Sequence, residues 1–233
     1  MMIKTKKITY KIFFFERVKK KIRFFDTETY PLQIRLSTGG RTIYLKSYFF
    51  RILSEEQYKA EINENDKRLL LDYIISAEKR LMDFLLSIDN IAHSPELVRQ
   101  RYALLCRDIL YELDRLFKVF LIDFFTSSKL PAYALFIENN KRNFTSEFIL
   151  KTLEKSLHPG IYGQLKESAA KHAPPYIPLI QFFRNSVDSP LPLLPLYTWQ
   201  QEDISRSFEQ FVKTNYPAYN NPSAYIDRLL RIQ

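Results

Sequence analysis

The sequence predicts a mostly helical α+β protein, in which a small basic antiparallel sheet of about three strands precedes a long antiparallel helical hairpin and further short helices. Two patterns lead to this class. Apolar and polar residues alternate over residues 30–46, which is typical of strands, whereas apolar residues recur every three or four positions after residue 54, which is typical of amphipathic helices. The 233 residues suit one large domain or two small ones.

The sheet is expected in residues 1–53, which we call the first lobe. The alternation assigns Leu32, Ile34 and Leu36 to one face and Gln33, Arg35 and Ser37 to the other. Thr38-Gly39-Gly40 supplies the positive backbone angles of a tight hairpin, after which Ile43 and Leu45 point inward and Thr42, Tyr44 and Lys46 outward. Residues 7–15 supply a third strand. Residues 16–29 are either a long basic loop or a further strand pair.

Two long helices are expected to follow. Ser54-Glu55-Glu56-Gln57 has the spacing of a capping box, and an apolar stripe continues from there to Ile88. Ser94-Pro95-Glu96 opens a second helix, whose stripe passes through Leu105, Ile109 and Leu113 to Phe124. Because the connection is short, the two helices should fold back as an antiparallel hairpin.

The remaining segments predict shorter helices. Residues 131–140 and 145–157 each suit one helix. Seven of the twelve prolines lie in residues 159–195, which favours short helices and turns there, with residues 191–196 packed on the helical body because they are too apolar for a linker. The last two helices are expected at residues 199–214, opened by the capping spacing of Thr198 and Gln201, and at residues 222–232.

The charge is unevenly distributed along the chain. Residues 1–53 contain 13 Lys or Arg and 3 Asp or Glu, a net charge of +10, while residues 54–233 contain 22 and 23, a net charge of −1. We therefore expect a basic β lobe at residues 1–53 and a neutral helical domain at residues 54–233. Such an asymmetry favours a polyanionic partner, either nucleic acid or an anionic membrane. The alternative is that the lysines have no partner and only make a small aromatic sheet soluble.

Several function classes find no support in the sequence. The three histidines are scattered without metal-ligand spacing, and the nucleophile, phosphate-loop and dinucleotide motifs are absent, so we expect no enzyme, no metal and no cofactor. Cys106 is expected to be a small buried side chain, and as the only cysteine it can form no disulfide within the chain. No apolar stretch has the length of a membrane span and the amino end is unlike a secretory signal, which predicts a cytoplasmic protein with no membrane partner.

The aromatic residues of the first lobe permit two interpretations. Eleven of them lie between Tyr10 and Phe50, interleaved with Lys and Arg. They could stack on unpaired bases, as in proteins that bind single strands, or simply form the core of a small sheet. The outward set of Gln33, Arg35, Tyr44 and Lys46 is more informative, because donors on an exposed antiparallel sheet can meet base edges in a major groove.

The order of these features resembles a known domain. A basic first strand, the hairpin from Tyr30-Pro31-Leu32 through Gly39-Gly40 to Tyr44-Leu45-Lys46, and a long helix with Glu61-Ile62-Asn63 near its start are similar to the amino-terminal arm-type DNA-binding domain of tyrosine recombinases, the phage-integrase-like enzymes of Bacteroidetes mobile elements. The resemblance covers about residues 5–90. It implies a three-stranded sheet that docks in the major groove. The catalytic domain has no counterpart, since H-x-x-R is absent.

We therefore predict a non-catalytic DNA-binding protein linked to a mobile element, whose basic β lobe contacts double-stranded DNA while the helical domain positions partners or forms a homodimer. The expected DNA-binding residues are Lys6, Lys11, Lys19, Lys20, Lys21, Arg35, Arg41, Tyr44 and Lys46. The alternative is a helical interaction protein whose basic lobe contacts an acidic protein or RNA, with no DNA role.

Overall fold

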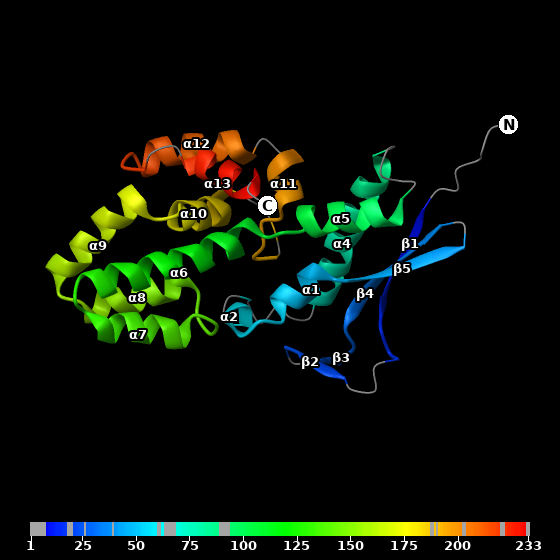
Figure 1. Ribbon diagram of the computed structural model, residues 1–233, viewed down its shortest axis with the longest axis horizontal. Coiled ribbons are helices and arrows are strands. Elements are labelled where there is room, and N and C mark those ends of the chain that lie inside the picture. Colours follow the sequence, from blue (N-terminus) through cyan, green and yellow to red (C-terminus); the bar gives the residue numbers. More distant parts are fainter. Residues whose placement is uncertain are drawn as a thin grey trace. The chain divides into compact units, whose positions relative to one another are not determined.

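The protein begins with strands and continues with helices, in agreement with the α+β, mostly α class (Figure 1). The computed structural model describes residues 8–17, 21–25, 27–38, 40–59, 62, 69–88, 94–186, 189, 191–201, 204–219 and 222–231. The strands are β1 (Thr9–Phe14), β2 (Ile22–Phe24), β3 (Thr27–Thr29), β4 (Leu32–Thr38) and β5 (Arg41–Lys46).

The helices follow without further strands in the described part of the chain. They are α1 (Tyr48–Leu53), α2 (Glu56–Lys59), α4 (Leu70–Ser87), α5 (Pro95–Leu105), α6 (Ile109–Ser127), α7 (Pro131–Asn140), α8 (Ser146–Ser156), α9 (Pro159–His172), α10 (Tyr176–Ser186), α11 (Leu196–Gln201), α12 (Ile204–Asn215) and α13 (Pro222–Arg231).

The predicted three-stranded sheet is confirmed. It is antiparallel with the strand order β1-β4-β5, so β4 lies in the middle. Leu32, Ile34 and Leu36 are buried while Arg35 is exposed, as the alternation predicts. At the hairpin turn Gly40 has a φ of +103°, a conformation that glycine adopts without strain because it lacks a Cβ atom. Its neighbour Gly39 lies outside the described residues.

Residues 16–29, for which the sequence left a loop and a strand pair open, contain the strand pair β2-β3. This small hairpin packs on α1 through stacked rings, with the centroids of Phe24 and Phe50 4.5 Å apart. The hairpin is therefore tied to the first helix rather than added to the three-stranded sheet.

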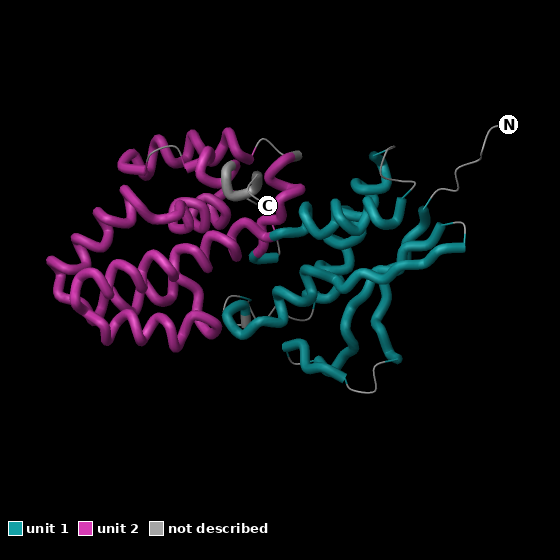
Figure 2. Tube along the Cα trace, in the orientation of Figure 1, with its two compact units in different colours: residues 1–107, 190–192 teal, residues 108–189, 193–233 magenta. Residues whose placement is uncertain are grey.

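The chain divides into two compact units (Figure 2). Unit 1 comprises residues 1–107 and 190–192, and unit 2 comprises residues 108–189 and 193–233. The predicted boundary at residue 53 does not coincide with this division, because α4 and α5 pack against the sheet and belong to unit 1. The basic strands thus share one core with helices from the region that we expected to form a separate domain.

A buried polar cluster joins the sheet to those helices. Ser47, between β5 and α1, donates to Glu78 Oε1 at 2.5 Å, and the Tyr102 hydroxyl of α5 donates to both Glu78 oxygens at 2.9 Å. On the same sheet face as Leu36, Tyr10 donates to Asp83 Oδ1 of α4 at 2.6 Å. Because buried polar groups are costly unless they are paired, the bonds of the buried Glu78 carboxylate fix α4 and α5 on the inner face of the sheet. The bond between Tyr10 and Asp83 is exposed and adds a further contact between β1 and α4.

The predicted helix start at Ser54 is wrong. Ser54 is the C-cap of α1, where its hydroxyl donates to the Phe50 carbonyl at 2.6 Å, and α2 after it has only four residues. The residue that caps a helix here is Ser47, whose side chain accepts from the Phe50 N–H. The long helix begins later, at Leu70, where Leu70 and Leu81 are buried as expected and Phe84 is half-buried.

The second long helix starts as predicted but does not continue. Ser94 caps α5 by accepting from the Leu97 N–H, and α4 packs against α5. The helix ends at Leu105, and α6 begins at Ile109 with Asp108 as its N-cap. The expectation of one helix from residue 95 to beyond Phe124 is therefore wrong, and the helix that packs on α4 is the shorter α5 with 11 residues.

The cause of this break lies far away in sequence. Asp108 is completely buried; its Oδ2 accepts from the Tyr111 N–H at 2.9 Å, and its Oδ1 accepts from the Leu194 N–H at 2.7 Å. The carboxylate therefore caps α6 and anchors the backbone of the proline-containing segment. Leu193, Leu194 and Leu196 are buried, which confirms that this segment packs on the helical body.

Most of the other predicted helices are confirmed. α7 and α8 match residues 131–140 and 145–157, with Thr145 as the N-cap of α8, and α9 and α10 occupy the proline-containing stretch. The helix expected at residues 199–214 is instead two helices, α11 and α12, and Thr198 lies inside the first of them. α13 matches the last expected helix.

Candidate nucleic-acid interface

The outer face of the three-stranded sheet brings predicted site residues together. Because β1, β4 and β5 pair in register, Lys11 lies directly opposite Arg35, and Arg35 directly opposite Tyr44. The next row of the same face joins Phe13, Gln33 and Lys46. The inner face is buried by α4 and α5, whereas Lys11, Arg35 and Lys46 are exposed and Tyr44 retains 54% of its accessible surface.

This face carries positive charge without compensation. Its outward positions include Lys11, Arg35 and Lys46 and no Asp or Glu. Among the residues that the structure describes, these three cations form no ion pair. Like charges directly opposite each other on an antiparallel sheet are destabilising, so the pair of Lys11 and Arg35 has a cost in the free protein that a bound anion would remove.

Two predicted site residues lie elsewhere. Arg41 pairs with Thr38 at the tip of the hairpin and has the same parity as Ile43 and Leu45, which places it on the opposite face of β5. Lys21 precedes β2 and lies 4.0 Å from Glu28 of β3, so it belongs to the small two-stranded hairpin. Neither residue shares the row of Lys11, Arg35 and Tyr44. The other three predicted residues, Lys6, Lys19 and Lys20, lie outside the described residues.

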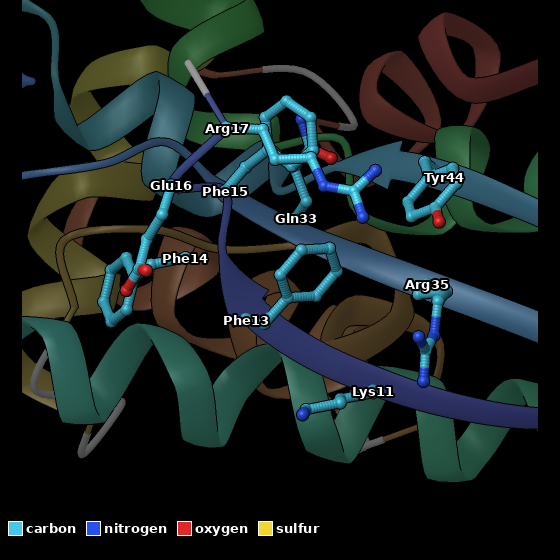
Figure 3. A pocket seen from close by; sticks show the side chains of 9 residues that line it. All are labelled: Lys11, Phe13, Phe14, Phe15, Glu16, Arg17, Gln33, Arg35 and Tyr44. Atoms are coloured by element: carbon cyan, nitrogen blue, oxygen red, sulfur yellow. The ribbon is translucent and has the colours of Figure 1, made fainter. Parts of the chain in front are cut away.

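A hollow opens on the outer face where β1 ends. It has a volume of about 470 Å³ and is lined by Lys11, Phe13, Phe14, Phe15, Glu16, Arg17, Gln33, Arg35 and Tyr44. Figure 3 shows the Phe13 ring amid the side chains of Arg17, Tyr44, Arg35 and Lys11, while Phe14 points away from them. Residues of all three strands and of the turn after β1 therefore meet in one place.

The sequence prediction missed Phe13, Phe15 and Arg17 of this lining, as well as Phe14 and Glu16. The Phe15 N–H donates to the Pro31 carbonyl at 2.9 Å, so the strand pairing continues past β1 and keeps Phe15 on the face of Lys11 and Phe13. The alternation of Lys11, Phe13 and Phe15 around the inward Phe14 was visible in the sequence. It became informative only with the register, because a Phe-rich strand is equally typical of a core.

The pKa shifts in unit 1 belong to the buried side of the sheet. Burial raises the pKa of Glu78 to about 7, although hydrogen bonds from Ser47 and Tyr102 oppose the change. Burial, together with the nearby Asp83 carboxylate, raises the pKa of Tyr10. These groups hold the scaffold, because their side chains are directed into the interface between the sheet and the helices.

The structure also bears on other site chemistries. Cys106 is buried, as expected, and burial raises the pKa of its thiol above the ordinary value, which keeps it protonated at neutral pH. In the described ranges no group of three or more His, Cys, Asp or Glu side chains is arranged to hold a metal ion. His158 serves as the N-cap of α9, where its Nδ1 accepts from the Gly160 N–H.

No family model, no curated protein and no solved structure matches this chain. A search of the described helices for a segment long and apolar enough to cross a membrane found none.

Proposed function

We propose that the protein is a non-catalytic DNA-binding protein, linked to a mobile element, that contacts duplex DNA with the outer face of β1, β4 and β5. One observation carries the proposal: Lys11 and Arg35 face each other on an exposed sheet surface that has no carboxylate. An arrangement that costs free energy in the free protein is expected where a polyanion is the partner. The resemblance of residues 5–90 to an arm-type domain supports the same function.

The shape of the sheet supports DNA as the polyanion. β4 and β5 form a hairpin within the three-stranded sheet, and strands of β-sheet DNA readers can enter the major groove, which is about 12 Å wide. Arg35, opposite Tyr44, and Lys46, opposite Gln33, project from the outer face of this hairpin. From these positions both cationic side chains can reach base edges. Arginine and lysine contacts to guanine are the commonest specific contacts in this groove.

The contacts should divide by role. Lys11 lies on β1, at the edge of the sheet and outside the hairpin, so it would neutralise a phosphate. Arg35 lies on the central strand, so it would contact bases. Loss of a phosphate contact should weaken binding to all DNA sequences equally, whereas loss of a base contact should weaken binding to the preferred sequence alone.

The test uses a duplex selected from a random pool and a scrambled duplex of the same composition. Arg35→Ala should lose about 1–3 kcal/mol of discrimination between them, which is the worth of one good bidentate base contact. Arg142→Ala is the matched control, because Arg142 is exposed and lies outside the sheet. Binding is measured by fluorescence anisotropy at fixed salt.

Absence of duplex binding by the parent protein at low salt would contradict the proposal. In that case the alternative, an acidic protein or RNA partner for the basic lobe, would replace it. Binding in which Arg35→Ala discriminates like the parent would show that Arg35 does not read the sequence.

A further inference from the structure

The outer sheet face changes in character along its strands. Near the hairpin tip it is polar, with Thr9, Ser37 and Thr42 in one row. Four residues further along β1 it becomes aromatic, with Phe13 and then Phe15. At about 3.3 Å per residue this distance is about 13 Å, close to four nucleotides at about 3.4 Å each. One bound strand would therefore meet both environments.

The aromatic end has features that a paired duplex would leave unused. The centroid of Phe13 lies 6.3 Å from that of Phe15 and 6.3 Å from that of Tyr44, with interplanar angles of 69° and 70°. Within the described part of the chain, Phe15 and Tyr44 have no further ring contact, so each has a face that no described ring covers. The faces of paired bases are covered by their neighbours in the stack, whereas an unpaired base can stack on such a ring.

Polar groups around the hollow fit the rest of a nucleotide. The Gln33 side chain has no hydrogen-bond partner in the described part of the protein, and its amide offers both a donor and an acceptor to a base edge. Arg17, Lys11 and Arg35 line the same hollow, and none of them forms an ion pair with a described residue. They supply the positive charge that a phosphate requires.

The size of the hollow also agrees with a single nucleotide. Its volume of about 470 Å³ falls within the range of about 300–1,000 Å³ that is typical of sites for small ligands. The hollow is lined by rings, one amide, three cations and the single carboxylate of Glu16, so its net charge is positive. This lining matches a base with its phosphate better than a purely apolar molecule.

We propose that the hollow binds an unpaired nucleotide of DNA, so that the preferred ligand is a junction between duplex and single strand. The base stacks on Phe15 beside the Gln33 amide, and Arg17 holds its phosphate. This inference rests on the proposed function, in which Lys11, Arg35 and Lys46 of the same face contact the duplex.

The test compares a blunt duplex, the same duplex with a short single-stranded overhang of either polarity, and the single strand alone. The parent protein should bind one overhang duplex about tenfold more tightly than the blunt duplex, since one stacked base contributes about 1–3 kcal/mol. Phe15→Leu should remove this preference while retaining most of the affinity for the blunt duplex. Phe148→Leu is the control, because Phe148 is a 47% exposed ring in unit 2.

A fluorescent base analogue in the overhang supplies a readout that is independent of affinity. Its emission should be quenched on binding to the parent protein, because the base stacks on a ring, and quenching should weaken in Phe15→Leu. Equal affinity for blunt and overhang duplexes, with no quenching, would overturn the inference and leave duplex binding standing. Tight binding of the single strand and none of the blunt duplex would support the hollow but refute the duplex function.

Discussion

Two groups of cations in this protein have opposite surroundings, one within unit 2 and one on the outer sheet face of unit 1. In unit 2, Lys118 is buried 2.5 Å from Asp114, and Arg184 and Lys151 lie 2.6 Å and 3.0 Å from Glu147. On the outer sheet face of unit 1, Lys11 and Arg35 face each other without a carboxylate. The comparison separates charges that hold the fold from charges that are available to a ligand, although the two kinds look alike in composition.

The paired cations of unit 2 have visible structural tasks. Asp114 Oδ1 accepts from the Ser146 N–H at 2.6 Å, and Lys118 donates to the Lys141 carbonyl at 2.9 Å. This ion pair therefore satisfies the amino end of α8 and the turn after α7, besides neutralising two buried charges. Such a pair is needed once it is buried, because removal of one partner leaves the other charge uncompensated.

The largest expected effect comes from breaking that pair. Lys118→Met should lower the free energy of unfolding by about 3–5 kcal/mol, because the Asp114 carboxylate stays buried without its cation. Lys151→Met is the control; its side chain is 67% exposed, and the loss should be below about 1 kcal/mol. Both are measured by urea denaturation, and similar losses in the two variants would show that burial does not separate these ion pairs.

The next effect sharpens the comparison through pH. The pKa of Glu78, raised from 4.5 to about 7 by burial, means that the folded protein binds more protons than the unfolded chain between these two values. The contribution of Glu78 to stability should therefore be largest below pH 4.5 and fall by about 3 kcal/mol as the pH rises through 7. Glu78→Gln should flatten this slope in pH-dependent denaturation curves.

The pKa of Glu147 in unit 2 is shifted in the opposite direction from that of Glu78, so Glu147 serves as the internal control. Burial alone would raise its pKa, but hydrogen bonds from Arg184 and Lys151 outweigh burial and lower it. Its contribution to stability is therefore present at neutral pH and is lost as the pH falls through the lowered pKa.

The Glu78→Gln variant also offers a way to contradict this account. If the free energy of unfolding depended on pH in the same way in Glu78→Gln and in the parent protein, Glu78 would not be a buried carboxylate held by hydroxyl groups without a cation.

The smallest effect concerns the unpaired cations. Lys11→Met should leave the free energy of unfolding unchanged or raise it by about 0.2–1 kcal/mol, because it removes a like charge directly opposite Arg35. The measurement is again urea denaturation, at low salt where surface repulsion is least screened. A clear loss of stability would mean that Lys11 has a structural partner and would remove the contrast between the units.

The local pattern of the sequence was sufficient for the sheet. In β4 and β5 the alternation and the glycine turn act over a few residues, so both strands, their inner faces and the left-handed Gly40 could be predicted. The break between α5 and α6 could not be predicted from such local patterns. It is stabilised by the bond from the Leu194 N–H to Asp108, and these two residues are 86 positions apart in the sequence. Ser54 has the pattern of a helix start, but the hydroxyl of Ser47 caps the helix that forms.

Half of the candidate site followed from the sequence for a similar reason. Arg35, Tyr44 and Lys46 lie on one predicted hairpin, so their shared face could be inferred from parity, which also places Arg41 on the other side. The hollow could not be predicted, since it requires the register of β1 against β4 and the continuation of pairing to Phe15 and Pro31. Composition indicated a basic lobe but not which of its cations are unpaired.

The central claim is that the unpaired cations of the outer sheet face bind DNA phosphates and bases, and the salt dependence of binding tests it most directly. The logarithm of the association constant for a duplex should fall linearly with the logarithm of salt concentration, and Lys11→Ala should make that slope shallower by about 0.9, the contribution of one phosphate contact. Lys155→Ala, an exposed lysine of unit 2, should leave the slope unchanged. A parent slope near zero, or an equal slope in Lys11→Ala and the parent, would contradict the claim.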